Sequence, residues 1–187
     1  MLSEAATTFF GLETEAVKVL VFEPLAVPGL LQTEAYAGAI IAGSPVKVSD
    51  EEIATRVKIR MRRQEALHGS SALEVVAVID EAVLHRMVGG PEVMRAQIEH
   101  LSELARRPNI AIQVIPFGSG AHAGMSGSFN IVQFSEPNDP DAVFVDFVAG
   151  QMFIEEPTEV RRYHAAFLHL VGSAVSPVNT LDVLTNR

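Results

Sequence analysis

The segment that most constrains the fold is a short apolar run at residues 73–79, LEVVAVI. The run is rich in β-branched side chains and is shorter than an ordinary buried helix, so it predicts a buried β-strand. Four more segments of this kind follow, separated by turns that carry glycine or proline. They lie at residues 110–115, 128–134, 142–148 and 151–154. The second half of the chain therefore predicts a sheet.

Helical patterns stand before, between and after these strands. Ser49 followed by Glu52 is a capping-box pattern, and Pro91 suits the first position of a helix. Asp80 or Glu81 opens a further helix, which stops at two glycines. The predicted helices cover residues 12–22, 30–42, 49–67, 80–89, 91–108 and 158–173. We therefore expect one α+β domain over residues 1–187, with a helical N-terminal half, a mostly antiparallel central sheet and a C-terminal helix.

Composition excludes several functional classes. The formal net charge of −9 disfavours binding to a polyanion, so we expect no nucleic acid to bind this chain alone. The absence of cysteine excludes disulfides, thiol catalysis and cysteine-based metal sites, and it fits a reducing cytoplasm. No apolar run approaches the roughly 20 residues of a membrane span. We expect a cytoplasmic protein without a membrane segment.

Neither a metal site nor a cofactor site is expected from the sequence. His164 and His169 lie five residues apart on a predicted helix, whereas a metalloprotease pair lies four apart with a glutamate between. No glycine-rich phosphate loop ending in Lys-Ser or Lys-Thr occurs. The prediction is therefore no metal and no cofactor.

Four blocks of sequence carry a family resemblance. They are residues 22–37 (FEPLAVPGLLQTEAYA), 57–64 (VKIRMRRQ), 79–95 (IDEAVLHRMVGGPEVMR) and 109–117 (NIAIQVIPF), the last followed by GAHAG at 120–124 and GSF at 127–129. In this order they resemble the regulatory, antitoxin-like domain that follows an XRE-type helix-turn-helix in actinobacterial transcription factors. Residues 143–146 (VFVD) differ from the family pattern, which tends to carry a tyrosine and a glutamate there.

This resemblance implies a sensory module. Only a short leader beginning at Met1 precedes the first block, so we expect the DNA-binding half to be missing. The resemblance then implies a domain that acts through a small protein partner or a bound metabolite. A homodimer is also compatible with it.

The best candidate for ligand binding is a set of arginines in an acidic protein. Arg56, Arg60 and Arg63 follow one another at spacings of four and three, which places them on one face of the predicted helix. Guanidinium groups on one face can clamp a carboxylate or phosphate. The structural alternative is pairing with neighbouring glutamates. Three residues after a Pro-Gly turn are candidates to line the same pocket, or are explained by the turn of helix that they occupy: Gln32, Thr33 and Tyr36.

Catalytic candidates are fewer. His122 lies in a glycine-rich loop between two predicted strands, where it can act as a general base or remain a solvated loop residue. Glu23, beside Pro24, can supply a proton or form an ordinary ion pair.

Two functions remain open from the sequence. The favoured one is a regulatory or sensory binding module for a small protein or a metabolite. The alternative is a stand-alone enzyme of secondary metabolism, a cofactor-independent cyclase or isomerase whose apolar pocket uses Glu23, His122 or Arg60. No catalytic constellation outweighs its structural explanation, so the prediction leans away from an enzyme.

Overall fold

A computed structural model describes residues 11–44, 48–135, 140–147 and 150–185 of the chain. The centre is a six-stranded mixed sheet in the order β3-β2-β1-β4-β5-β6. The β1–β2 and β2–β3 pairs are parallel, and the β1–β4, β4–β5 and β5–β6 pairs are antiparallel. The strands are β1 (Lys18–Glu23), β2 (Glu74–Asp80), β3 (Ile110–Ile115), β4 (Phe129–Gln133), β5 (Ala142–Phe147) and β6 (Gly150–Ile154).

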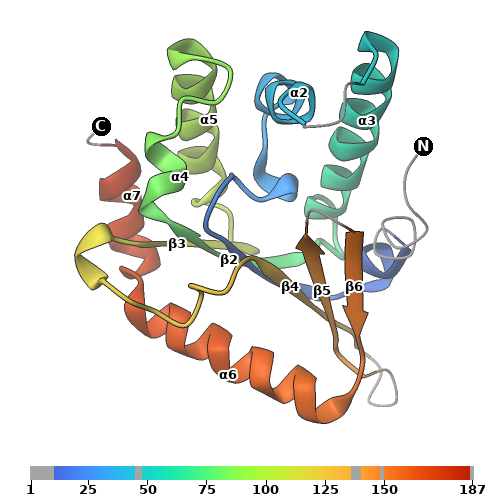
Figure 1. The fold of residues 1–187 in the computed structure, drawn as a ribbon, viewed down its shortest axis with the longest axis vertical. Helices are drawn as coiled ribbons and strands as arrows, with labels where there is room; N and C mark the ends of the chain where they lie inside the picture. Colours follow the sequence, from blue (N-terminus) through green and yellow to red (C-terminus); the bar gives the residue numbers. More distant parts are fainter. Residues whose placement is uncertain (1–10, 45–47, 136–139, 148–149, 186–187) are drawn as a thin grey trace.

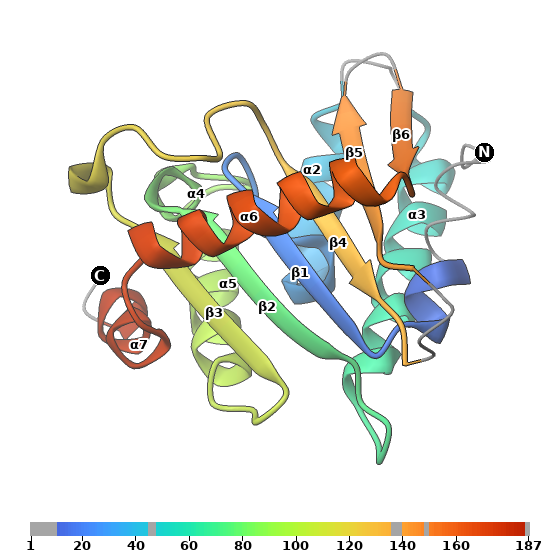
Figure 2. The same cartoon turned by 90° about the horizontal axis from the view of Figure 1, so that it is seen from below.

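Helices cover both faces of this sheet, which makes the protein α+β as the sequence predicts. Helices α2 to α5 lie on one face and α6 crosses the other, while α7 packs against α5 and β3 (Figures 1 and 2). The helices are α2 (Glu34–Ala42), α3 (Asp50–Arg63), α4 (Glu81–His85), α5 (Pro91–Leu104), α6 (Pro157–Ser173) and α7 (Pro177–Thr185), with short 3-10 turns η1 (Gly29–Leu31), η2 (Gln64–Leu67) and η3 (Phe117–Ser119).

Local capping explains where several helices begin. The Ser49 side chain accepts a hydrogen bond from the backbone N–H of Glu52, which starts α3, and Asp80 caps α4 in the same way through Ala82. Pro91 is the first residue of α5, where its missing N–H leaves no bond unmade. These three starts agree with the sequence prediction.

The predicted helix over residues 12–22 is wrong for most of its length. Only its first part is helical, at residues 11–15, and Lys18–Glu23 forms the central strand β1. Because both faces of β1 are buried, its apolar residues do not alternate with polar ones, and periodicity alone cannot separate such a strand from a buried helix. The N-terminal half is therefore less helical than expected.

Helices α4 and α5 end at His85 and Leu104, earlier than the predicted ends at residues 89 and 108. The helix expected over residues 30–42 is divided into η1 and α2, because Thr33 takes an extended conformation and caps α2 with its side chain. Helix α7 was not predicted. Its threonine and asparagine residues disfavour a helix locally, and its position depends on packing against α5 and β3.

The core has two main parts, one on each face of the sheet. The larger lies under α2 to α5 and includes Val19, Leu31 and Leu101. The smaller lies over α6 and includes Phe22, Phe129 and Phe167. Towards β5 and β6 the first face is not filled by apolar side chains, and a polar cavity remains there.

Candidate functional site

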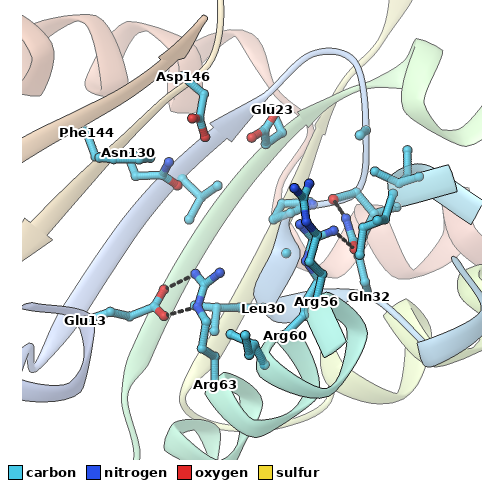
Figure 3. A pocket seen from close by; sticks show the side chains of 18 of the residues that line it. Glu13, Glu23, Leu30, Gln32, Arg56, Arg60, Arg63, Asn130, Phe144 and Asp146 are labelled. Carbon is cyan, nitrogen blue, oxygen red and sulfur yellow. Dashed lines mark hydrogen bonds and ion pairs between the residues drawn. The ribbon is translucent and has the colours of Figure 1, made fainter. Parts of the chain in front are cut away.

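A cavity of about 410 Å³ lies between the sheet and helix α3. It is at the carboxyl end of β1, where the parallel part of the sheet meets the antiparallel part. In open α/β sheets this kind of position, beyond strand ends at a change of strand order, is where ligands bind. Polar residues line much of it: Glu13, Glu23, Gln32, Arg56, Arg60, Arg63, Asn130, Asp146 and Gln151 (Figure 3).

The sheet side of the cavity is built from alternate residues of neighbouring strands. Val21 pairs with Asn130, and Asn130 pairs with Phe144, so these three form one row across β1, β4 and β5. Strands β1 and β5 run in the same direction, because both are antiparallel to β4. Glu23 follows Val21 by two residues, and Asp146 follows Phe144 by two. Both carboxyl groups therefore lie in the next row on the same face. Figure 3 shows both entering the cavity from the sheet.

Glu23 has an unusual environment for a carboxyl group. Burial and the negative charge of Asp146 raise the pKa of Glu23 from 4.5 to about 8, against an opposing effect of Arg60. Among the described residues, no hydrogen bond or ion pair within 4.0 Å engages the carboxyl group of Glu23 or of Asp146. At neutral pH Glu23 is therefore mostly protonated and can donate a hydrogen bond to whatever occupies the cavity.

The helix side carries the three arginines that the sequence places on one face of α3, and all three line the cavity. Arg63 donates two hydrogen bonds to the buried Glu13, at 2.6 and 2.8 Å. Arg56 donates to Glu52 at 2.6 Å, but its Nε is buried and has no partner in the described part of the chain. The predicted face is thus real, and pairing with glutamates accounts for part of it.

Arg60 differs from its two neighbours. Its Nη1 donates to Oε1 of Gln32 at 2.8 Å, and no carboxylate of the described ranges lies within 4.0 Å of it. Burial and the nearby charge of Arg63 lower the pKa of Arg60. Its positive charge is therefore held at the cavity without a direct counter-ion.

Side-chain amides hold the loop that frames this arginine. Gln32 is only 3% exposed, and its Nε2 donates to the carbonyl of Val27 at 2.7 Å, which leaves Oε1 for Arg60. Gln64 donates to the carbonyls of Gly29 and Gln32, at 3.1 and 2.8 Å. Because Gln32 and Gln64 are both held by hydrogen bonds, Arg60 is oriented before any ligand arrives.

The other two candidates beside the Pro-Gly turn have structural roles. Thr33 caps α2, and its backbone N–H donates to Oε1 of Gln97 at 2.8 Å. Tyr36 is fully buried, and its hydroxyl accepts a hydrogen bond from the backbone N–H of Val27 at 3.1 Å. Desolvation raises its pKa. Of the three, only Gln32 lines the cavity.

His122 lies on the opposite face of the sheet, in edge contact with the ring of Phe22. Its Nδ1 accepts from the backbone N–H of Gly124 at 3.2 Å, so in the neutral ring the proton is on Nε2, 3.5 Å from Asp80. Gly124 packs so closely that an added Cβ would lie 2.2 Å from the Phe22 ring. The contacts of His122 therefore hold its loop against the end of β2. The structure does not bring His122 together with Glu23 or Arg60.

Four polar residues of the cavity were not predicted as site residues from the sequence: Glu13, Asn130, Asp146 and Gln151. Asp146 is the one charged residue of the otherwise apolar strand β5, AVFVDF. Its charge is noticeable along the sequence, but it does not say which distant residues Asp146 meets.

A second hollow, of about 910 Å³, lies between α4, α5 and α7 and is largely apolar. Its charged residues Arg95, Glu99, Glu103 and Arg106 are all exposed, and Arg95 pairs with Glu99 at 2.8 Å. The cavity beside α3 differs because most of its charged side chains, Arg60 and Glu23 among them, are at least partly buried. No group of three or more His, Cys, Asp or Glu residues that could hold a metal occurs within the described ranges.

The fold and cavity define an α+β protein with a small, charged cavity on one face of its sheet. The chain belongs to the family described as a domain of unknown function, DUF5753, whose model matches residues 6–186. No curated protein matches the chain. Within the described residues, no single helix is long and apolar enough to cross a membrane, and only α6 and α7 together, across a 58° bend, satisfy that test.

Proposed function

We propose that this chain is a sensory binding module that takes a small metabolite in the cavity beside α3. The observation that carries the proposal is that acidic and basic side chains line opposite sides of one cavity without forming an ion pair with each other. Glu23 and Asp146 face it from the sheet, and Arg60 faces it from α3, with no direct ion pair among them. Buried polar groups without partners lower stability, so they are usually kept where a ligand supplies the partners.

The size and shape of the site favour a small molecule. Pockets for metabolites are typically concave, with volumes of about 300–1,000 Å³ and a few polar groups that set orientation. The cavity of about 410 Å³ falls in this range. A protein partner would instead need a broad exposed surface, so we assign the metabolite to this cavity and leave the small protein partner as a separate prediction.

The regulatory part of the proposal depends on the resemblance to the effector domain of XRE-type regulators. Two of the four blocks that carry this resemblance, residues 22–37 and 57–64, contain Glu23, the loop of Gln32, and Arg60 and Arg63 of α3. These two blocks thus contribute to the lining of the cavity, whereas residues 79–95 and 109–117 do not. This supports a ligand-sensing role over a purely structural one.

An enzymatic function has one specific observation in its favour. A protonated Glu23 close to the ionisable Asp146 resembles the carboxyl pairs that transfer protons, in which environment separates the two pKa values. A cofactor-independent isomerase or cyclase would use Glu23 as the acid. His122 would have no direct part in it, because it lies on the other face of the sheet.

The test is native mass spectrometry after incubation with a metabolite extract of the source organism. Wild type should retain a small molecule, and Arg60→Gln should retain at least tenfold less. Arg62→Gln is the matched control, because Arg62 is exposed on the same helix and does not line the cavity. Equal retention by wild type and Arg60→Gln would remove the cavity from the function. A metabolite that leaves as an isomer, and does so only when Glu23 is present, would establish the enzyme instead.

A further inference from the structure

We propose that the cavity beside α3 recognises a zwitterion, a small molecule with an anionic group for Arg60 and a cationic amine for the carboxyl pair of Glu23 and Asp146. This inference rests on the proposed function and names the chemical class of its ligand. The juxtaposition that carries it is a positive wall on α3 facing an acidic wall on β1 and β5 across one cavity.

Arg60 is the anion-binding element of the positive wall. Arg63 is neutralised by two hydrogen bonds to Glu13, and Arg56 is partly neutralised by Glu52. Among the described residues, Arg60 forms a hydrogen bond only with the amide of Gln32. A guanidinium group has five N–H donors, and most of those on Arg60 remain for a ligand. A carboxylate or phosphate is the partner that uses two of them together.

The acidic wall is the amine-binding element. Asp146 lines the cavity with an exposed side chain. Glu23, at the end of β1, lines it with a partly buried one. Asn130, one row away, adds an amide without a partner among the described residues. An ammonium group has three donors and no acceptor, which matches two carboxyl groups and an amide oxygen.

The two walls exclude ligands with a single charge. An anion bound to Arg60 would face the negative charge of Asp146, and a cation bound to Asp146 would face Arg60. A neutral ligand would leave the partly buried Arg60 and the facing Asp146 without oppositely charged partners, which costs binding free energy. Only a ligand with both charges satisfies both walls at once.

Short amino acids with different spacers provide a defined probe. We would titrate wild type with β-alanine, 4-aminobutanoate and 6-aminohexanoate, following backbone amide shifts by NMR. Each zwitterion is compared with the acid and the amine of the same length that lack the other group. We expect at least one zwitterion to bind tenfold or more tightly than both of its analogues, with shifts at Glu23, Arg60 and Asp146.

Two variants assign each charge to its wall. Arg60→Gln should remove the preference of the zwitterion over the amine, and Asp146→Asn should remove its preference over the acid. Arg62→Gln and Glu155→Gln are controls with the same charge changes, since both residues are exposed and outside the cavity. Equal loss in the controls would reduce the effect to net charge and overturn the proposal.

The remaining outcomes separate the ligand class from the function. If an acid or an amine binds as tightly as its zwitterion, or if no zwitterion of the series binds, the ligand class is wrong. The binding function then still stands if wild type retains a metabolite from the extract that Arg60→Gln does not. If wild type retains nothing and no probe shifts the cavity residues, both proposals fail.

Discussion

The two faces of the sheet are built from the same strands but have opposite characters. Neighbouring residues go to different faces: Phe22 packs towards α6 while Glu23 enters the cavity, and Phe129 and Asn130 divide in the same way. On the α6 face, Phe129 lies 5.1 Å from the ring of Tyr163 and 5.9 Å from that of Phe22, centre to centre. The other face keeps a hollow lined by charges.

This difference separates stability from function within one sheet. Close-packed aromatic rings provide binding energy between α6 and the sheet without any specific chemistry. The polar face lowers stability instead, because Glu23 and Arg60 are partly buried and neither forms an ion pair within the described part of the chain. Changes on the α6 face should therefore alter stability, and changes on the cavity face should alter binding and pH dependence.

The largest effect is expected from Phe129→Ala. Phe129 is 4% exposed and contacts the rings of Phe22, Tyr163 and Phe167, so its truncation leaves a void between α6 and the sheet. We expect a loss of about 3–5 kcal/mol in the free energy of unfolding, measured by urea denaturation. Phe147→Ala is the control, because Phe147 is 52% exposed on the neighbouring strand β5 and should cost under about 1 kcal/mol. Similar losses in both variants would mean that burial of Phe129 between α6 and the sheet does not account for its effect.

A smaller effect, dependent on pH, is expected from Glu23→Gln. The folded state keeps the Glu23 proton up to a pKa of about 8, whereas the unfolded state releases it near 4.5. The stability of wild type should therefore fall as pH rises from 4.5 to 8, with a slope of at most about 1.4 kcal/mol per pH unit from this group. Glutamine cannot ionise, so the variant should match wild type near pH 4.5 and be more stable by about 1–2 kcal/mol at pH 8, less than the full slope gives because water enters the cavity.

The measurement is urea denaturation of wild type and Glu23→Gln at pH 5, 6.5 and 8. Asp146→Asn serves as a second variant, because removal of the neighbouring charge lowers the pKa of Glu23 and should flatten the slope. Curves for Glu23→Gln that run parallel to those of wild type would show that this carboxyl group ionises normally in the folded protein.

The smallest effect is expected from His122→Ala. The variant loses the hydrogen bond from Gly124 and the contact with Asp80, which together should cost about 1 kcal/mol. Hydrogen exchange should become faster at residues 120–127, while retention of the metabolite stays at the wild-type level. If this variant no longer retained the metabolite, His122 would contribute to the functional site although it lies on the other face of the sheet.

The sequence predicted those parts of the fold that depend on neighbouring residues. Ser49 and Pro91 marked the starts of α3 and α5 because capping and proline geometry act within one helical turn. The arginine face was predicted for the same reason, since spacings of three and four define one side of a helix. Strand β1 was missed because a strand buried on both faces has no alternating pattern.

The cavity itself was only partly predictable. Glu23, Gln32 and the three arginines were candidates from the sequence, but nothing local connected them with Asp146 or Glu13. The sequence also made His122 and Glu23 joint catalytic candidates. His122 contacts Phe22 on one face of the sheet, and Glu23 lines the cavity on the other face. This separation follows from strand alternation, and it could not be predicted while residues 12–22 were expected to form a helix.

By itself, then, the sequence determined an α+β chain with capped helices, short strands and one arginine-bearing helix face. Only the tertiary structure decided that Arg63 binds Glu13, that Arg60 has no carboxylate partner among the described residues, and that Glu23 stands beside Asp146. Backbone preferences and caps act over a few residues, so they can be read along the chain. Burial and charge environment arise where distant segments meet, because the protonation of a carboxyl group depends on everything packed around it.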